Sequence, residues 1–182
     1  MRHAFAIVLL AFSLNPAWGA APQGTPDAPQ VKIDIQFEYK NFAPRVALYE
    51  VKANARLWDT KSVASAKDAP IAGPMQGTVL AMAPGQDRRF ALVVQNTGDQ
   101  PLYFFAAPHV VQPPEQALGF KFKCLCVNRA YKVEPHETWY RIVEFRLSPD
   151  FAGDGLTVMH SIIGIDEKRA DAFSKAPVMP EF

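Results

Sequence analysis

The chain contains two cysteines in 182 residues, Cys124 and Cys126, and a single residue separates them. In an extended strand, side chains two positions apart lie on the same face, with Cα atoms about 6.6 Å apart. A disulfide needs Cβ atoms about 3.8 Å apart, so a regular strand would have to kink before the two sulfurs could join. One metal ion spans the gap more easily, because metal–thiolate bonds of about 2.3 Å let two sulfurs about 4.5 Å apart share it.

The donor chemistry of this pair favours copper(I). Soft thiolates select copper(I), zinc or iron–sulfur clusters. Zinc in structural sites takes four protein ligands, whereas the chain offers two thiols. Copper(I) accepts two or three ligands and therefore fits two sulfurs alone, although a dimer that pools four cysteines would relax this restriction. We predict that Cys124 and Cys126 bind copper(I).

Two other roles for the cysteines stay open at this point. Phe120 and Phe122 share parity with the cysteines, so all four side chains would line one face of a continuous strand. A buried free cysteine often behaves as a small apolar residue, which would make the chain a metal-free β-sandwich interaction module. Alternatively, a strained and labile C-x-C disulfide would serve a thiol–disulfide enzyme. No hydrolase or nucleotide-binding motif is visible, and we expect no enzymatic activity.

Other side chains could complete a metal site. Met159 and His160 are neighbours in a predicted strand, and both thioether and imidazole groups suit copper. They point to opposite faces of that strand, so at most one of them can join the thiols. His109 lies in the segment that crosses toward the cysteines, whereas His136 lies in a predicted turn and is expected to face solvent.

Cationic side chains flank the cysteines on both sides. Nearby cations lower the pKa of a thiol and favour the thiolate that binds metal, and they can steer an acidic partner. The alternative is a solvated strand face from which these side chains alternate outward. The four residues are Lys121, Lys123, Arg129 and Lys132.

The N-terminus predicts export. Arg2 precedes an eleven-residue apolar stretch at residues 4–14, and the small residues Ala17 and Gly19 occupy the −3 and −1 positions before Ala20. This pattern is typical of a cleaved secretory signal peptide, residues 1–19. The apolar stretch is too short to span a bilayer, which takes about 20 residues. We therefore expect a mature protein that is periplasmic and has no membrane span.

The sequence after the predicted signal peptide is expected to form one domain with little net charge. The chain has 19 basic and 18 acidic residues, and removal of Arg2 with the signal peptide balances them. No basic field for a nucleic acid is present, so we expect no nucleic-acid partner. Residues 20–30 carry three prolines and are expected to form a disordered leader.

Strand patterns fill residues 31–165. Residues 31–39 alternate apolar and polar side chains, as a half-buried strand does. Residues 42–76 fit a short helix or two short strands, with loops at 62–70 and around Gly73 and Pro74. Roughly six to eight short strands with turns every 8–12 residues predict an antiparallel β-sandwich. A tail with one short helix is expected at 166–182. The other predicted strands are 78–82, 89–95, 101–106, 138–147 and 156–165.

Several motifs follow one another in a fixed order. They are Met-Ala-Pro-Gly at 82–85, Phe-Ala-Leu-Val-Val-Gln-Asn-Thr-Gly-Asp-Gln-Pro at 90–101, Gly-Phe-Lys-Phe-Lys-Cys-Leu-Cys at 119–126, Glu-Pro-His-Glu at 134–137 and Val-Glu-Phe-Arg-Leu-Ser-Pro-Asp-Phe at 143–151. This order resembles the cytochrome c oxidase copper-assembly family, the CtaG-type copper chaperones. That family has a C-F-C-F motif, and here Leu125 and Val127 replace its phenylalanines. The resemblance covers roughly residues 77–165.

The resemblance implies an all-β, immunoglobulin-like antiparallel β-sandwich that binds copper(I) through Cys124 and Cys126. It also implies delivery of copper to a client cuproenzyme such as cytochrome c oxidase, and a homodimer bridged by copper. From the resemblance and the residues together, we expect a periplasmic copper(I) metallochaperone.

Overall fold

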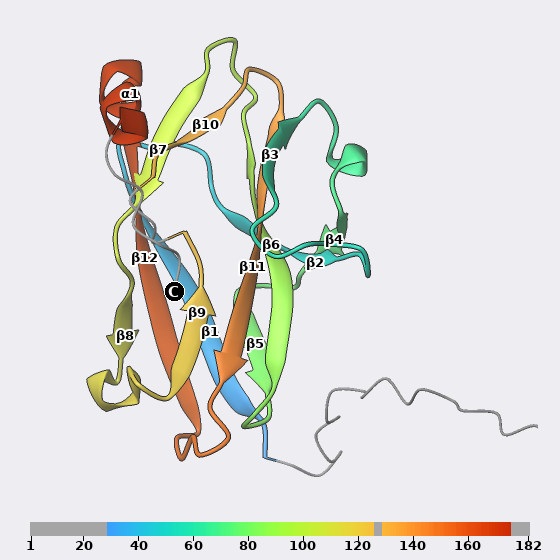
Figure 1. Ribbon diagram of the computed structural model, residues 1–182, viewed down its shortest axis with the longest axis vertical. Coiled ribbons are helices and arrows are strands. Elements are labelled where there is room, and N and C mark those ends of the chain that lie inside the picture. Colours follow the sequence, from blue (N-terminus) through green and yellow to red (C-terminus); the bar gives the residue numbers. More distant parts are fainter. Residues whose placement is uncertain (1–28, 126–128, 176–182) are drawn as a thin grey trace, which may run out of the picture.

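The computed structural model describes residues 29–125 and 129–175, which form two packed β-sheets (Figure 1). The predicted all-β sandwich is therefore confirmed, while its immunoglobulin-like subtype stays a prediction. The predicted signal peptide, most of the predicted leader and Cys126 lie outside the described residues. None of the described helices is long and apolar enough to cross a membrane.

Sheet A has six strands in the order β10-β7-β12-β1-β5, with β8 also paired to β12. Its members are β1 (Val31–Lys40), β5 (Val79–Met82), β7 (Leu102–Ala106), β8 (Val110–Gln112), β10 (Tyr131–Val133) and β12 (Gly155–Ile165). The first and last strands pair in parallel over nine positions, from Lys32 opposite Gly155 to Lys40 opposite Ile163. This central pair departs from the predicted antiparallel sandwich. A parallel pair needs a long connection, and here all the intervening strands supply it.

Sheet B also has six strands, in the order β3-β11-β6-β2-β4, with β9 also paired to β11. Its members are β2 (Ala47–Val51), β3 (Thr60–Val63), β4 (Ile71–Pro74), β6 (Asp87–Gln95), β9 (Phe120–Lys123) and β11 (Thr138–Leu147). Every pairing in this sheet is antiparallel. One edge of β11 pairs with β6, while β3 and β9 share its other edge.

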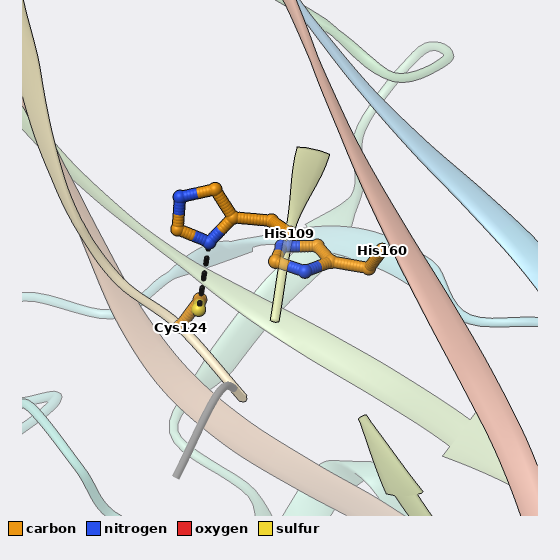
Figure 2. A group of neighbouring side chains, drawn as sticks. All are labelled: His109, Cys124 and His160. Atoms are coloured by element: carbon orange, nitrogen blue, oxygen red, sulfur yellow. Dashed lines mark hydrogen bonds between the residues drawn. The ribbon is translucent and has the colours of Figure 1, made fainter. Parts of the chain in front are cut away.

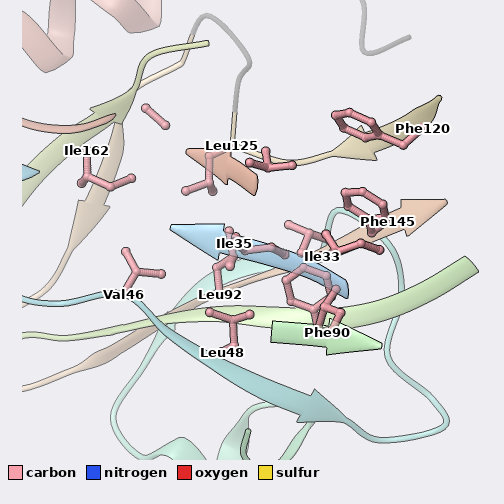
Figure 3. Packing of buried hydrophobic residues seen from close by; sticks show 14 of the residues in the cluster. Ile33, Ile35, Val46, Leu48, Phe90, Leu92, Phe120, Leu125, Phe145 and Ile162 are labelled. Carbon is pink, nitrogen blue, oxygen red and sulfur yellow. The ribbon is translucent and has the colours of Figure 1, made fainter. Parts of the chain in front are cut away.

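The core lies between the two sheets (Figure 3). Ile33 and Ile35 from sheet A meet Phe90 and Leu92 from sheet B in this core, and none of the four side chains is exposed to solvent. Leu125, just beyond β9, is buried among them. In β12, every second residue from 156 to 162 is buried, as the predicted alternation requires. The polar member of that row is His160, which is 0% exposed.

Residues 42–76 form strands rather than a helix, together with the short 3-10 helix η1 (Ala66–Asp68). The loop predicted around Gly73 and Pro74 is wrong, because both residues belong to β4. Since β4 is the edge strand of sheet B, the missing N–H of proline leaves no internal ladder bond unmade. The loop predicted at residues 62–70 begins at residue 64 in the structure, two residues later than predicted, because β3 continues to Val63.

The short helix predicted in the tail is confirmed as α1 (Glu167–Lys175). It docks on the outside of sheet A, where the ring of Phe173 lies 5.1 Å from that of Phe105 on β7.

Gly164, near the end of β12, allows the chain leaving β1 to pass close by. A Cβ atom at this position would overlap the backbone carbonyl oxygen of Asn41, which has a left-handed φ of 53°.

We expect Gly164→Ala to lower the free energy of unfolding by at least about 1–3 kcal/mol, because the added methyl group overpacks this site. Gly73→Ala is the matched control, because nothing lies within 4 Å of its added Cβ, and a change within about 0.5 kcal/mol is expected. Urea unfolding measures both, and equal effects would contradict the steric argument.

Candidate metal centre

Three side chains with metal-binding atoms meet at one place between the sheets: His109, Cys124 and His160 (Figure 2). Their ligand atoms all lie within 4.8 Å of one another. The Sγ atom of Cys124 is 3.7 Å from Nδ1 of His109, and the two imidazole centroids are 5.4 Å apart with planes at 84°. The three residues come from distant parts of the sequence, so the tertiary fold creates the cluster.

His160 is placed by the alternation of β12. Its side chain faces the other sheet and is fully buried, whereas the neighbouring Met159 is half-buried and has the opposite parity. The prediction that Met159 and His160 point to opposite faces of this strand is confirmed by the burial pattern. Phe37, the register partner of His160 on β1, stacks on the imidazole with centroids 5.7 Å apart.

His109 is placed by a β-bulge. Strand β7 pairs with β12 up to Ala106 opposite Ile162, and β8 resumes the pairing with Val110 opposite Met159. Between these points, residues 107–109 oppose residues 160 and 161, so one residue is extra, as in a bulge. The extra residue shifts the parity, and His109 consequently faces the same interior as His160.

Cys124 lies just beyond the end of β9 and is 4% exposed. The prediction of one continuous strand carrying Phe120, Phe122, Cys124 and Cys126 on one face is wrong, because the strand ends at Lys123. Cys124 and Leu125 are both buried in succession, which no regular strand with one wet face allows. Cys126 itself lies outside the described residues.

A buried arginine holds this turn of the chain. Arg141 on β11 is 1% exposed, and its Nε donates a hydrogen bond to the carbonyl oxygen of Cys124 at 3.2 Å. Its Nη1 donates to Oγ1 of Thr60 at 2.9 Å, and its guanidinium lies 4.5 Å from the ring centroid of Trp58. Sequence reasoning missed Arg141. Its inward parity within the predicted strand 138–147, shared with Val143, was a signal that could have found it.

The strand that leads to Cys124 is fixed by a second charged group. Glu144 on β11 is buried and accepts hydrogen bonds from Nε of Arg89 at 2.9 Å and Nζ of Lys123 at 3.0 Å. Burial would raise the pKa of Glu144, but these two hydrogen bonds and the charges of both cations outweigh it and hold the pKa below its usual value.

The remaining predicted residues face solvent or pair with other charged groups. Lys121 and Arg129 are exposed, as the solvated-face alternative expected. Lys132 forms an ion pair with Glu134 at 2.8 Å. His136 faces solvent, as predicted, with Nε2 at 2.8 Å from Oδ1 of Asp99 and a side chain 64% exposed.

Residues 31–165 match the family model described as a domain of unknown function (DUF8709). The chain belongs to this family. The DUF8709 match runs from the first residue of β1 to the last residue of β12 and includes His109, Cys124 and His160. Among curated proteins, none matches the chain.

Arg141→Met tests the arginine as the support of the Cys124 turn. We expect the free energy of unfolding to fall by about 2–4 kcal/mol, because two hydrogen bonds from a charged donor and a contact with Trp58 are lost. Arg146→Met on the same strand is the control: its side chain is 56% exposed and its ion pairs measure 3.6 and 4.0 Å, so a loss below about 1 kcal/mol is expected. Comparable losses in urea unfolding would show that Arg141 is not a special support.

Glu144→Gln tests the second anchor through pH. The folded pKa of Glu144 is below the unfolded value of 4.5, so its stabilisation is complete above about pH 4.5 and is lost as the pH falls through the folded pKa. We expect the variant to be less stable than the parent by about 1–3 kcal/mol at pH 7, and by clearly less at pH 3. Glu50→Gln, which removes a half-exposed partner of Arg88, should have a small effect at both pH values. A deficit that is the same at both pH values would refute the role of the Glu144 carboxylate.

Proposed function

We propose that this protein is a periplasmic copper(I) metallochaperone that binds the ion at Cys124 and carries it to a client cuproenzyme. The observation that carries the proposal is the cluster itself: a thiol and two imidazoles whose ligand atoms lie within 4.8 Å of one another. Thiolate and imidazole are ligands that copper accepts readily. Cys126, the second thiol of the C-x-C motif, remains a predicted ligand.

The spacing within the cluster suits one shared ion. Bonds of about 2.0 Å to nitrogen and 2.3 Å to sulfur, opened to a trigonal angle of about 120°, place the two donor atoms about 3.7 Å apart. The distance between Sγ of Cys124 and Nδ1 of His109 is 3.7 Å. A hydrogen bond between the thiol and the imidazole gives a similar separation. In the alternative function, a metal-free interaction module, this hydrogen bond would account for the contact.

The surroundings of the cluster suit a metal that must be kept from water and oxidants. The rings of Phe37 and Phe122 lie 5.7 and 5.4 Å from His160, and the ring of Phe120 lies 5.9 Å from His109. Such an apolar shell controls solvent access to a metal site. His109 is half-buried, whereas Cys124 and His160 are buried, so the accessible side of the site is the His109 side.

Two features of the sequence support the proposed destination of the copper. The predicted signal peptide at residues 1–19 supports a periplasmic location. The motif order that resembles the CtaG-type copper chaperones supports cytochrome c oxidase as a client and a copper-bridged homodimer as the carrier form.

An anaerobic copper(I) titration of the reduced mature protein against a competing chromogenic chelator tests the proposal. We expect tight binding that Cys124→Ser weakens by about 100-fold or more, since loss of even a supporting residue costs 10- to 100-fold. His136→Ala is the matched histidine control and should bind as the parent does. A parallel zinc(II) titration tests selectivity.

Unchanged copper(I) affinity in folded Cys124→Ser would contradict the proposal. Zinc binding tighter than copper(I) would also contradict it. A protein that binds neither metal and resists alkylation of its thiols until it unfolds would instead be the interaction module.

A further inference from the structure

The cluster contains more than copper(I) carriage requires. Two thiolates of a C-x-C motif suffice for copper(I), yet the fold places two imidazoles against Cys124, one of them fully buried. We propose that copper at His109, Cys124 and His160 exchanges between copper(I) and copper(II), so that the protein transfers single electrons. This inference rests on the proposed function in requiring copper at this site, and it goes beyond that function in assigning a redox role.

The donor set is the first argument. A thiolate stabilises copper(I), whereas imidazole nitrogen also suits copper(II), and a trigonal set of two histidines and one cysteine is typical of copper electron-transfer centres. A site built from thiolates alone would instead be oxidised by copper(II).

The fixed positions of the donors are the second argument. His160 lies on β12, between the pairing with β1 and the bulge at residues 107–109. The carbonyl oxygen of Cys124 accepts a hydrogen bond from buried Arg141. Because each donor is held by a different part of the sandwich, the geometry changes little when the ion gains or loses an electron, which favours rapid transfer.

The charge and burial of the site are the third argument. Arg141 is 1% exposed, and its positively charged guanidinium donates a hydrogen bond to the backbone carbonyl oxygen of Cys124. A nearby cation in a poorly solvated site opposes further positive charge, so it favours copper(I) over copper(II) and raises the reduction potential. The half-buried ring of His109 (Figure 2) gives a one-electron partner an approach to the metal.

The reaction is balanced by one electron. Copper(I) gives an electron to a one-electron acceptor and becomes copper(II), and no protein bond forms or breaks. A one-electron donor reverses the step. The competing reaction consumes the thiols: two copper(II) ions oxidise two thiols to one disulfide, giving two copper(I) ions and two protons.

Anaerobic addition of one equivalent of copper(II) to the reduced mature protein tests the inference, followed by visible absorption and electron paramagnetic resonance. We expect an intense thiolate-to-copper(II) charge-transfer band that ascorbate bleaches and hexacyanoferrate(III) restores over repeated cycles. Cys124→Ser should abolish the band, His109→Ala should shift or weaken it, and His136→Ala should leave it unchanged.

Loss of the copper(II) signal on mixing, with one disulfide formed per two ions, would overturn the inference. So would a band that persists in Cys124→Ser. A copper(I) titration of the same samples separates the two proposals. Failure to bind copper(I) defeats both of them, whereas tight copper(I) binding together with disulfide formation by copper(II) defeats the redox role alone.

Discussion

The backbone pairing of β12 is the constraint on which the rest of this sandwich depends. It pairs with β1 along one edge, and with β7 and β8 along the other. Because side chains alternate, a slip of one residue in these registers would turn His160 out of the interior and Met159 into it. The bulge at residues 107–109 depends on this fixed register, because it is the extra residue relative to β12 that brings His109 to the same side as His160.

Strand β11 provides the complementary constraint from sheet B. Two of its charged residues have opposite parity, and both act on the segment that ends at Cys124. Glu144 holds Lys123, the last residue of β9, through an ion pair at 3.0 Å, and Arg141 holds the carbonyl oxygen of the next residue at 3.2 Å. Burial of a charged group costs free energy unless the group forms hydrogen bonds or ion pairs. Moving Cys124 would break the contacts of Arg141 and Glu144 and would therefore destabilise sheet B.

The regular parts of the fold could be predicted from the sequence, and the irregular parts that make the site could not. Alternation located β1 and β12 and separated His160 from Met159 by face. No local pattern announces a one-residue bulge or a parallel pairing between the first and last strands, because both arise from long-range backbone contacts. The end of β9 at Lys123 was missed for the same reason: the hydrogen bond from Arg141 that fixes Cys124 comes from a distant strand. Gly73 and Pro74 were read as a loop because composition does not show that β4 is an edge strand.

The folded cluster also changes the argument about which metal the chain selects. From the sequence alone, zinc was disfavoured by the number of ligands, since two thiols fall short of the four that structural zinc takes. His109 and His160 remove that objection, and selectivity must then rest on coordination geometry. Within the described residues, three potential ligands converge, and aromatic rings of Phe37, Phe120 and Phe122 pack against the two imidazoles. A three-coordinate pocket with apolar walls would suit copper(I) better than tetrahedral zinc, so under the proposed function the packing around the donors, more than their number, would be the physical basis for selecting copper.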